Sequence, residues 1–276
     1  MNKVKLSDIL NYSILLISCV LILGPVFWAL STAIKSRAQI FTYPPIIFPS
    51  KPFFGNFTSE FFLKIFLRYL SNTLFVALVT ILVSVTIAFL AAYSAARYDY
   101  KGKDTILFLL WATIMVPGIC ILVPLYILAA RLGLYDSYII LILVYSAWLI
   151  PTMTWLLKSF IESIPPEIDE MATIDGCSRL QIIYYIILPI AKPGLAAAAV
   201  LGFVYVWNDF TRAYTLTISD KYRTVQTGLY FMISDWGVEW GPMMAAVITT
   251  LIPILIMFFL LQRYFIYGLS SGAVKG

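Results

Sequence analysis

Residues 165–193, PPEIDEMATIDGCSRLQIIYYIILPIAKP, form an acidic and proline-bounded segment within a very apolar chain. Its first third carries four acidic residues, which are Glu167, Asp169, Glu170 and Asp175. Long runs without any charge lie on either side. Because charged side chains are costly in hydrocarbon, the pattern indicates a structured connection between two membrane-spanning helices.

The composition of the whole chain supports the same interpretation. Of its 276 residues, 61% are hydrophobic and only 12% are charged, whereas an ordinary soluble domain carries about 25% charged residues. A soluble core of this length cannot cover so much apolar surface, but lipid can. We therefore expect an integral membrane protein of the all-α class.

Charge and cysteine content exclude several other classes. The net charge of +5 comes from cations scattered among loops, so the sequence predicts no nucleic-acid-binding surface. The chain has no histidine, and its cysteines, Cys19, Cys120 and Cys177, have no CxxC spacing. Neither a metal site nor a disulfide framework is therefore predicted.

Uncharged runs predict the membrane spans, because a helix needs about 20 mostly apolar residues to cross the hydrocarbon core. Five runs are long enough: Ile9–Ile34, Tyr69–Ala96, Thr105–Ala130, Ser137–Leu157 and Trp240–Gln262. A sixth, Pro193–Asn208, is shorter and is followed by Asp209. Two interpretations of Asp209 stay open: it faces protein or a wet cavity inside the membrane, or it lies among the lipid headgroups.

Six spans place both termini on one side of the membrane. Three cations crowd the short loop after the second run: Arg97, Lys101 and Lys103. The next short loop has only Arg131, so cytoplasmic termini are favoured, although Lys35 and Arg37 argue the other way. Lys3 and Lys5 precede a first run that is too long for a signal peptide, so we expect that run to be retained as a span.

The loop between the first two runs is long and proline-rich. It ends in EFFLKIFLRYL (residues 60–70), a pattern typical of a short helix lying in the membrane interface. The apolar stripe of this helix is formed by Phe61, Phe62, Ile65, Phe66 and Tyr69. The tripeptide Asn56-Phe57-Thr58 matches a glycosylation sequon, but such short matches are common by chance.

The acidic segment, which we define as residues 163–189, is predicted to form two short helices. Pro165 and Pro166 suit a first helical turn, and the acids that follow lie near the positive end of the helix dipole. Ile168, Met171 and Ala172 have the spacing of one apolar face. Gly176 can end this helix by adopting a positive φ.

The second helix of the acidic segment is predicted to begin at Ser178. Ser178 and Gln181 have the spacing of a capping box. Four residues along the helix form an apolar face: Leu180, Ile183, Tyr184 and Ile187. Pro189 is expected to end the helix.

Three roles are considered for the acidic segment as a whole. A DNA-binding motif would need basic residues, and a merely solvated loop would not need two capped helices. A docking surface for a partner protein uses both the apolar faces and the acids.

The acidic segment resembles the EAA motif, which marks permease subunits of binding-protein-dependent ABC importers. That motif is Glu-Ala-Ala, three residues, Gly, nine residues and Ile-x-Leu-Pro. The matching residues are Glu170, Met171, Ala172, Gly176, Ile186, Leu188 and Pro189. Met171 and Cys177 stand where the family usually has Ala. AAYSAARYDYKGKD, WNDF and the terminal GLSSGAVKG resemble the carbohydrate-uptake branch, specifically the maltose G-type permease subunits.

The resemblance implies six transmembrane helices, with the acidic segment as a cytoplasmic helix-turn-helix coupling segment between spans four and five. It also implies contacts with an ATPase for Glu170, Asp175 and Arg179, a tight turn at Gly176, and a face buried in the ATPase formed by Met171 and Ala172. ATP and Mg²⁺ would bind that ATPase, because the one Gly-Lys pair here, Gly102-Lys103, lacks the rest of a P-loop.

The resemblance further implies the partners and their location. These are a second, homologous permease subunit in a heterodimer, two cytoplasmic ATPase domains and an extracytoplasmic sugar-binding protein, in a bacterial or archaeal inner membrane. Residues 1–68 would form the first span and outer loop, residues 69–263 the permease core, and residues 264–276 a cytoplasmic tail with an extended backbone. The outer segment 213–239 would meet the binding protein.

For the translocation path we expect the end of the fifth span, where Trp207, Asn208 and Asp209 could stack on and hydrogen-bond a sugar. Alternatively, Trp207 belongs to an interfacial aromatic belt while its two neighbours cap a helix or brace the subunit interface.

Three functional alternatives stay open: a permease for a non-sugar solute, an ion-coupled carrier, and a membrane enzyme. A carrier usually has ionisable groups well inside its spans, and only Asp209 comes close to this. An enzyme would need a catalytic cluster, for which the sequence offers no histidine and no paired intramembrane carboxylates.

Overall fold

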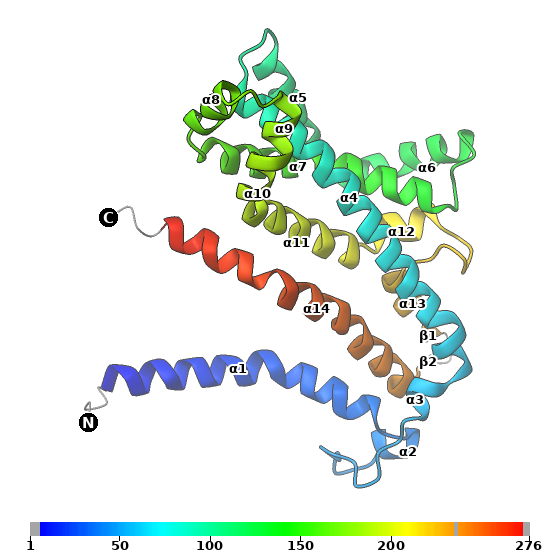
Figure 1. Cartoon of the computed structure of the whole chain (residues 1–276). Coiled ribbons are helices and arrows are strands. Elements are labelled where there is room, and N and C mark those ends of the chain that lie inside the picture. Colours follow the sequence, from blue (N-terminus) through cyan, green and yellow to red (C-terminus); the bar gives the residue numbers. More distant parts are fainter. Residues whose placement is uncertain (1–5, 235–236, 273–276) are drawn as a thin grey trace. The chain divides into compact units, whose positions relative to one another are not determined.

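The computed structural model describes residues 6–234 and 237–272, and this part of the chain is almost entirely helical (Figure 1). The α-helices are α1 (Leu6–Ala33), α2 (Arg37–Ile40), α3 (Gly55–Thr58), α4 (Leu67–Arg97), α5 (Lys103–Met115), α6 (Leu122–Arg131), α7 (Tyr138–Glu162), α8 (Glu167–Ile174), α9 (Arg179–Gln181), α10 (Leu188–Ile190), α11 (Lys192–Asn208), α12 (Thr211–Leu216), α13 (Val225–Phe231) and α14 (Trp240–Gly272). Two π-helical segments, η1 (Phe62–Phe66) and η3 (Ile182–Ile187), and a 3₁₀ turn, η2 (Gly118–Ile121), complete the helical elements.

A short hairpin lies between α13 and α14 and leaves the predicted all-α class unchanged. Strand β1 (Ile233–Ser234) pairs antiparallel with β2 (Gly237–Val238), so that Ile233 lies opposite Val238. With two residues in each strand, the hairpin is a local turn rather than a sheet.

The chain divides into two compact units. The first comprises residues 1–68 and 228–252, and the second comprises residues 69–227 and 253–276. The domain limits expected from the sequence remain predictions.

In the first unit, Asn56 fixes the chain that leaves α1. It is 7% exposed, and its Nδ2 donates to the carbonyl oxygens of Ala33 (2.8 Å) and Lys35 (2.9 Å). A Cβ on Gly241, in the first turn of α14, would approach the Asn56 amide to 2.8 Å, so only glycine fits there. Because its amide is buried and engaged, Asn56 is not available as a glycan acceptor.

In the second unit, α7 provides the central face of the core. Its fully buried side chains recur every four residues, a spacing that places them on one side of a helix: Tyr145, Leu149, Met153, Leu157 and Ile161. Helix α11 packs against this face. A Cβ on Gly202 of α11 would lie 2.5 Å from Cε of Met153, so the glycine permits the close approach of the two helices.

The structure contains four single helices that are long and apolar enough to cross a membrane, among the residues that it describes. These are residues Leu10–Ala33, Phe62–Arg97, Tyr138–Glu162 and Trp240–Gln262. Two bent pairs also qualify if each is counted as one span: Lys103–Met115 with Gly118–Arg131, and Arg179–Ile190 with Lys192–Asn208. Several apolar spans in one chain make this a multi-pass membrane protein, while the count of six remains a prediction.

The predicted span over Thr105–Ala130 is not a single straight helix, although it still qualifies as one bent span. Helices α5 and α6 meet at an angle of 89° across a break at Val116 and Pro117. Val116 has an extended backbone (ψ 119°), as expected for a residue before proline, and Pro117 has no N–H to continue the helix. The break therefore has a local cause that hydropathy alone does not register.

The predicted short helix over residues 60–70 is not a separate element. The π-helical turn η1 continues directly into α4, and the two are counted as one span from Phe62 to Arg97. Phe62 and Phe66 are 6% and 0% exposed. These two residues of the apolar stripe are therefore packed against protein, while a position of this segment at the membrane interface stays a prediction.

Two predicted helix ends lie elsewhere. Pro189 does not end the second helix of the acidic segment, because the π-helical η3 leads into α10 and the bend of 75° comes at Ala191. In a regular α-helix, a proline ring clashes with the backbone carbonyl four residues earlier. The wider π turn places this carbonyl elsewhere, so the helix can continue through Pro189. At the C-terminus, α14 continues to Gly272, so residues 264–272 are helical rather than extended. Residues 273–276, with Lys3 and Lys5, lie outside the described residues.

Candidate functional site

The first helix of the acidic segment ends in a tight turn at Gly176, as predicted. Helix α8 starts directly after Pro166, with three acids in its first turn. Gly176 has φ +83°, its N–H donates to Thr173 O (3.1 Å), and the N–H of Cys177 donates to Ala172 O (3.0 Å). This pair of bonds is the Schellman ending of a helix. A Cβ on Gly176 would meet no atom within 4 Å, so the backbone conformation rather than crowding requires glycine.

The second helix starts at Ser178, also as predicted. The N–H of Ser178 donates to Oε1 of Gln181 at 2.7 Å, one of the two bonds of a capping box. The predicted apolar face is not preserved along it, however. Leu180 and Tyr184 are 75% and 64% exposed, whereas Ile187 is fully buried. The π-helical η3 causes this, because its turn holds more residues than the α-helical turn that the spacing assumed.

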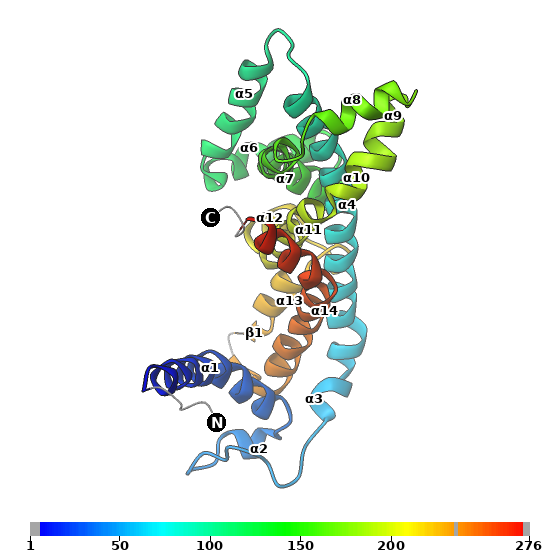
Figure 2. The same ribbon diagram turned by 60° about the vertical axis from the view of Figure 1, so that its left-hand side comes forward.

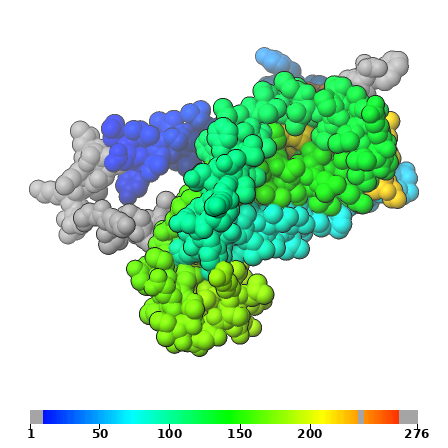
Figure 3. All heavy atoms as spheres, turned by 90° about the horizontal axis from the view of Figure 1, so that it is seen from above, coloured from blue at the N-terminus to red at the C-terminus, as the bar shows by residue number. Residues whose placement is uncertain are grey.

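Most of the predicted docking residues lie on the surface of the acidic segment. Those that are exposed are Glu170, Met171, Asp175, Gly176 and Arg179. Ala172, in contrast, is only 5% exposed and packs against its own chain, so it does not share an outer face with Met171. Figure 3 shows the yellow-green atoms of this region projecting from the green and teal atoms of the same unit.

The inner side of α8 is attached to the end of α4. Nε of Arg97 donates to Oδ2 of Asp169 at 2.8 Å, and the hydroxyl of Tyr93 donates to Oδ1 at 2.8 Å. Nη2 of Arg97 also donates to the carbonyl of Ile164 at 2.9 Å. Sequence reasoning used Asp169 only as a helix-dipole residue and missed this cluster. The available signal was the spacing of Tyr93 and Arg97 on one face at the end of a span, ahead of an acidic helix.

A small polar hollow lies beside this attachment. Its volume is about 270 Å³, and its lining includes Tyr98, Glu170 and Cys177. The guanidinium of Arg179 lies over the ring of Tyr98, 5.0 Å from its centre. Stacking of this kind ties α9 to the residue that directly follows α4. Both short helices of the acidic segment thus contact the same end of α4.

The predicted path residues at the end of α11 differ in their surroundings. Trp207 is fully buried and stacks on Phe203 at 5.0 Å, so its ring face is not available to a solute in this conformation. Asn208 is exposed, and its Nδ2 donates to Val204 O at 2.8 Å.

Asp209 faces protein and lies directly after the end of α11 at Asn208, while its depth in the membrane stays a prediction. Its carboxylate accepts the hydroxyl of Tyr145 (3.0 Å), Nη1 of Arg212 (2.7 Å) and the backbone N–H groups of Arg212 (3.0 Å) and Ala213 (3.3 Å). The side chains of Asp209 and Arg212 are 8% and 15% exposed. Asp209 therefore caps α12 and braces it against α7 with a nearly buried ion pair.

A larger apolar hollow lies next to this brace, between α5, α6 and α7. Its volume is about 400 Å³, and its lining includes Leu125, Val144, Trp148 and Arg212. The Arg212 guanidinium lies over the Trp148 ring at 4.9 Å. A Cβ on Gly118 would come within 2.9 Å of Nη2 of Arg212, so the break after α5 lets the guanidinium pack against backbone.

Residues 84–270 match the family model described as "Binding-protein-dependent transport system inner membrane component". This chain belongs to that family. The match includes the end of α4, the whole acidic segment and the brace at Asp209. Family membership agrees with the spacing of Glu170, Gly176 and Pro189 in the sequence.

Curated relatives cover nearly the whole permease chain. It is 35% identical to the inner membrane ABC transporter permease protein YcjP of Escherichia coli (strain K12), with 100% of this chain and 99% of that protein covered. It is 35% identical to the maltodextrin transport system permease protein MdxG of Bacillus subtilis (strain 168), covering 81% and 83%. It is 31% identical to the diacetylchitobiose uptake system permease protein DasC of Streptomyces coelicolor, covering 91% of each.

Solved structures show that the fold is shared. The permease chain aligns with a TM-score of 0.84 and 22% identity to a chain from the crystal structure of a bacterial ABC transporter involved in the import of the acidic polysaccharide alginate, covering 96% of this chain and 100% of that one. A chain of the alginate transporter in complex with a periplasmic protein aligns with a TM-score of 0.64 and 20% identity, covering 93% and 94%.

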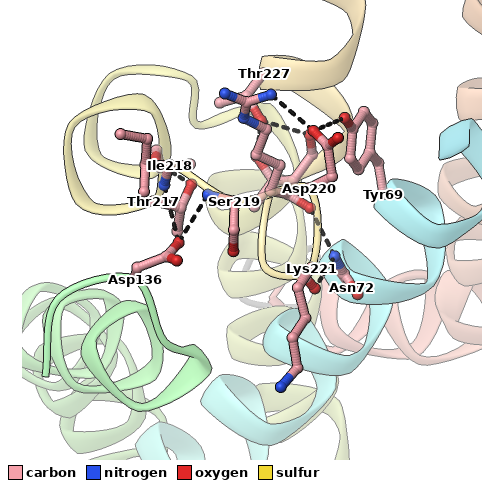
Figure 4. A network of polar contacts seen from close by, with 12 residues as sticks. Tyr69, Asn72, Asp136, Thr217, Ile218, Ser219, Asp220, Lys221 and Thr227 are labelled. Atoms are coloured by element: carbon pink, nitrogen blue, oxygen red, sulfur yellow. Dashed lines mark hydrogen bonds and ion pairs between the residues drawn. The ribbon is translucent and has the colours of Figure 1, made fainter.

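The loop between α12 and α13 of the permease is held by polar groups, of which Asn72 and Tyr69 are buried (Figure 4). Nδ2 of Asn72 donates to the carbonyls of Lys221 and Arg223, both at 2.9 Å. Asp220 accepts the hydroxyl of Tyr69 at 2.5 Å. Oδ1 of Asp136 accepts the N–H groups of the loop residues Ile218 (2.9 Å) and Ser219 (3.0 Å). This segment lies within residues 213–239, which we had predicted as the outer contact region, and its internal order was not foreseen.

Proposed function

We propose that the chain is the permease subunit of an ATP-driven importer and forms half of the path for a sugar or oligosaccharide. An extracytoplasmic binding protein would deliver the solute, and a second, homologous permease subunit would form the other half of the path. Support comes from family membership together with the names of relatives, which include permeases of maltodextrin and diacetylchitobiose transport systems.

The observation that carries the proposal is the architecture of the acidic segment. Its outer side presents Glu170, Met171 (58% exposed) and Ile174 (85% exposed), a mixture of charge and apolar surface suited to a protein partner. Its inner side is attached to α4 by a nearly buried ion pair. A projecting element that is rigidly connected to the spans can transmit movement from one subunit to another.

The partner that moves this segment would be a cytoplasmic ATPase subunit, with ATP and Mg²⁺ bound there. The chain's own contribution is then mechanical: the outer side of α8 follows the ATPase, and the connected helices follow α8. This assignment places the acidic segment and both termini in the cytoplasm. It also places the loop between α12 and α13 opposite the binding protein.

The solute path is proposed to pass the end of α11. Of the three predicted residues there, Asn208 is exposed, whereas Asp209 holds α12 in place. Trp207 would reach a solute only after a rearrangement of the helices, because it is packed inside the unit. Alternating access requires such rearrangements, so the assignment is tested best on the complete transporter.

Purification of the tagged protein in mild detergent from its native membranes tests the proposal. We expect a second multi-pass permease and a P-loop ATPase to copurify in stoichiometric amounts. Recovery of the chain alone, with uptake that survives ATP depletion but collapses with the membrane potential, would instead support an ion-coupled carrier. If the complex forms, the solute bound by its binding protein decides between a sugar and another solute.

A further inference from the structure

We infer that Arg97 and Asp169 fasten the acidic segment to α4, and that this attachment carries its movement into the membrane part of the permease. The inference rests on the proposed function and deepens it. The acidic segment is joined covalently to α7 and, through η3 and α10, to α11. The ion pair adds a third connection, to a helix from which α8 is far removed in sequence.

The geometry makes Arg97 the centre of this connection. It is the last residue of α4, and its guanidinium binds two different parts of the segment. One is the carboxylate of Asp169 in the first turn of α8, and the other is the carbonyl of Ile164 in the connection from α7. Figures 1 and 2 both show α8 and α9 beside the end of α4.

Both carboxylate oxygens of Asp169 accept hydrogen bonds from α4. Arg97 binds Oδ2 and the Tyr93 hydroxyl binds Oδ1, so two residues one turn apart on α4 hold both oxygens of Asp169. Rotation of α8 about its own axis would break at least one of these bonds. The contact therefore fixes the orientation of α8 as well as its position.

The ion pair between Arg97 and Asp169 differs from an ordinary surface ion pair because it is nearly buried. The side chains of Arg97 and Asp169 are 8% and 15% exposed. The pair Lys103–Asp99 lies close by in sequence, but its aspartate side chain is 100% exposed and its two residues are four apart in the chain. Removing one partner of a nearly buried pair leaves an uncompensated charge, whereas removing one partner of an exposed pair has little effect.

The two sides of α8 thus have separate roles. Glu170, Met171 and Ile174 face outward, whereas Asp169 and Ala172 face the chain itself. A force applied to Met171 reaches the Asp169 carboxylate within one helical turn and passes from there to Arg97. We assign Arg97 and Asp169 as positioning residues, since neither is expected to contact the solute or the nucleotide.

The test uses the complete transporter, purified from native membranes and reconstituted in lipid vesicles. ATP hydrolysis is measured with and without the extracytoplasmic binding protein recovered from the same cells. We expect Arg97→Gln and Asp169→Asn to leave the ATPase bound and its basal hydrolysis intact, while stimulation by the binding protein falls about tenfold. The exchange R97D/D169R should restore a large part of the stimulation, which a merely structural loss would not do.

Two further variants keep the result unambiguous. Lys103→Gln removes the exposed neighbouring pair and should leave stimulation unchanged. Tyr93→Phe removes one hydrogen bond without leaving a buried charge, and it should lower stimulation by an intermediate amount even if the charge variants fail to assemble. Wild-type stimulation in Arg97→Gln or in Tyr93→Phe would overturn the inference. Absence of an ATPase from the wild-type preparation would instead overturn the proposed function.

Discussion

Asp136 shows how one carboxylate holds the backbone of two loop residues. It has φ +57°, which is unusual for a residue other than glycine, and its Oδ1 accepts two backbone N–H groups of the loop between α12 and α13. Burial alone would raise the pKa of this carboxyl. The N–H groups of Ile218 and Ser219, the Ser219 side chain and the positive charge of Arg223 together stabilise its charged form and outweigh burial, so its pKa lies below the ordinary value.

We predict that Asp136→Asn costs about 1 kcal/mol of stability and Asp136→Ala about 3 kcal/mol. Asparagine tolerates the left-handed backbone and keeps a neutral acceptor, whereas alanine leaves two N–H groups without a partner. Because the folded pKa is depressed, the advantage of the wild type over Asp136→Asn is full above about pH 5 and is lost as the pH falls below about 4. Urea unfolding in detergent at several pH values measures both effects. A difference that does not change with pH would contradict the assignment.

Lys35 illustrates the opposite case of a buried cation. It is 2% exposed and lies over the Trp28 ring at 4.7 Å, and no carboxylate pairs with it in the described part of the chain. Loss of hydration lowers the pKa of its ammonium group. The lowered pKa means that the folded state disfavours the charge that it carries at neutral pH, so stability rises as the pH rises through this pKa.

We predict that Lys35→Met raises the apparent Tm by a few degrees at pH 7. Methionine keeps the apolar stem without the unpaired charge. Lys51 is exposed, so Lys51→Met provides the matched control and should leave the Tm unchanged. A lower Tm for Lys35→Met would show that the ammonium group is stabilised by a partner in the membrane.

At the scale of elements, the turn between α8 and α9 depends on one backbone conformation. Gly176 and Gly102 have nearly the same φ, +83° and +88°, and a Cβ on either would meet no neighbouring atom. Valine at either position costs about 1–2 kcal/mol from the left-handed backbone. The two glycines therefore allow strain to be separated from function.

We predict that Gly176→Val uncouples the transporter and Gly102→Val does not. Both variants should lose similar stability, but only Gly176→Val changes the angle between α8 and α9. Stimulation of ATP hydrolysis by the binding protein should fall several-fold in Gly176→Val and stay near the wild-type level in Gly102→Val. Equal losses in both would mean that general destabilisation, rather than the turn, is responsible.

At the scale of the whole molecule, the native cysteines report which side of the membrane each part faces. Cys177 lies in the acidic segment and is partly exposed. With Cys19→Ser and Cys120→Ser, it is the sole thiol. We predict that a membrane-impermeant maleimide labels Cys177 in inside-out vesicles stripped of ATPase, and that bound ATPase lowers the labelling rate about tenfold. Labelling from the opposite face would reverse the proposed orientation.

Sequence reasoning succeeded where the signals are local. The turn at Gly176 and the bond between Ser178 and Gln181 each depend on residues within one helical turn, and both were predicted correctly. The break at Pro117 had a local signal as well, but span counting by uncharged runs ignores it. The contact between Arg97 and Asp169 was missed because it joins residues 72 positions apart, and only the packing of α4 against α8 brings them together.

The π-helical η3 also affects how the chain tolerates a change in its length. Six residues, Ile182–Ile187, occupy this wider turn between α9 and α10. Five residues of a regular α-helix turn about as far around the helix axis as these six, so η3 accommodates one additional residue without turning α9 away from α10. Deletion of one residue within η3 should therefore keep the direction of the acidic segment, whereas deletion of one residue within α8 would turn the residues beyond it by about 100°.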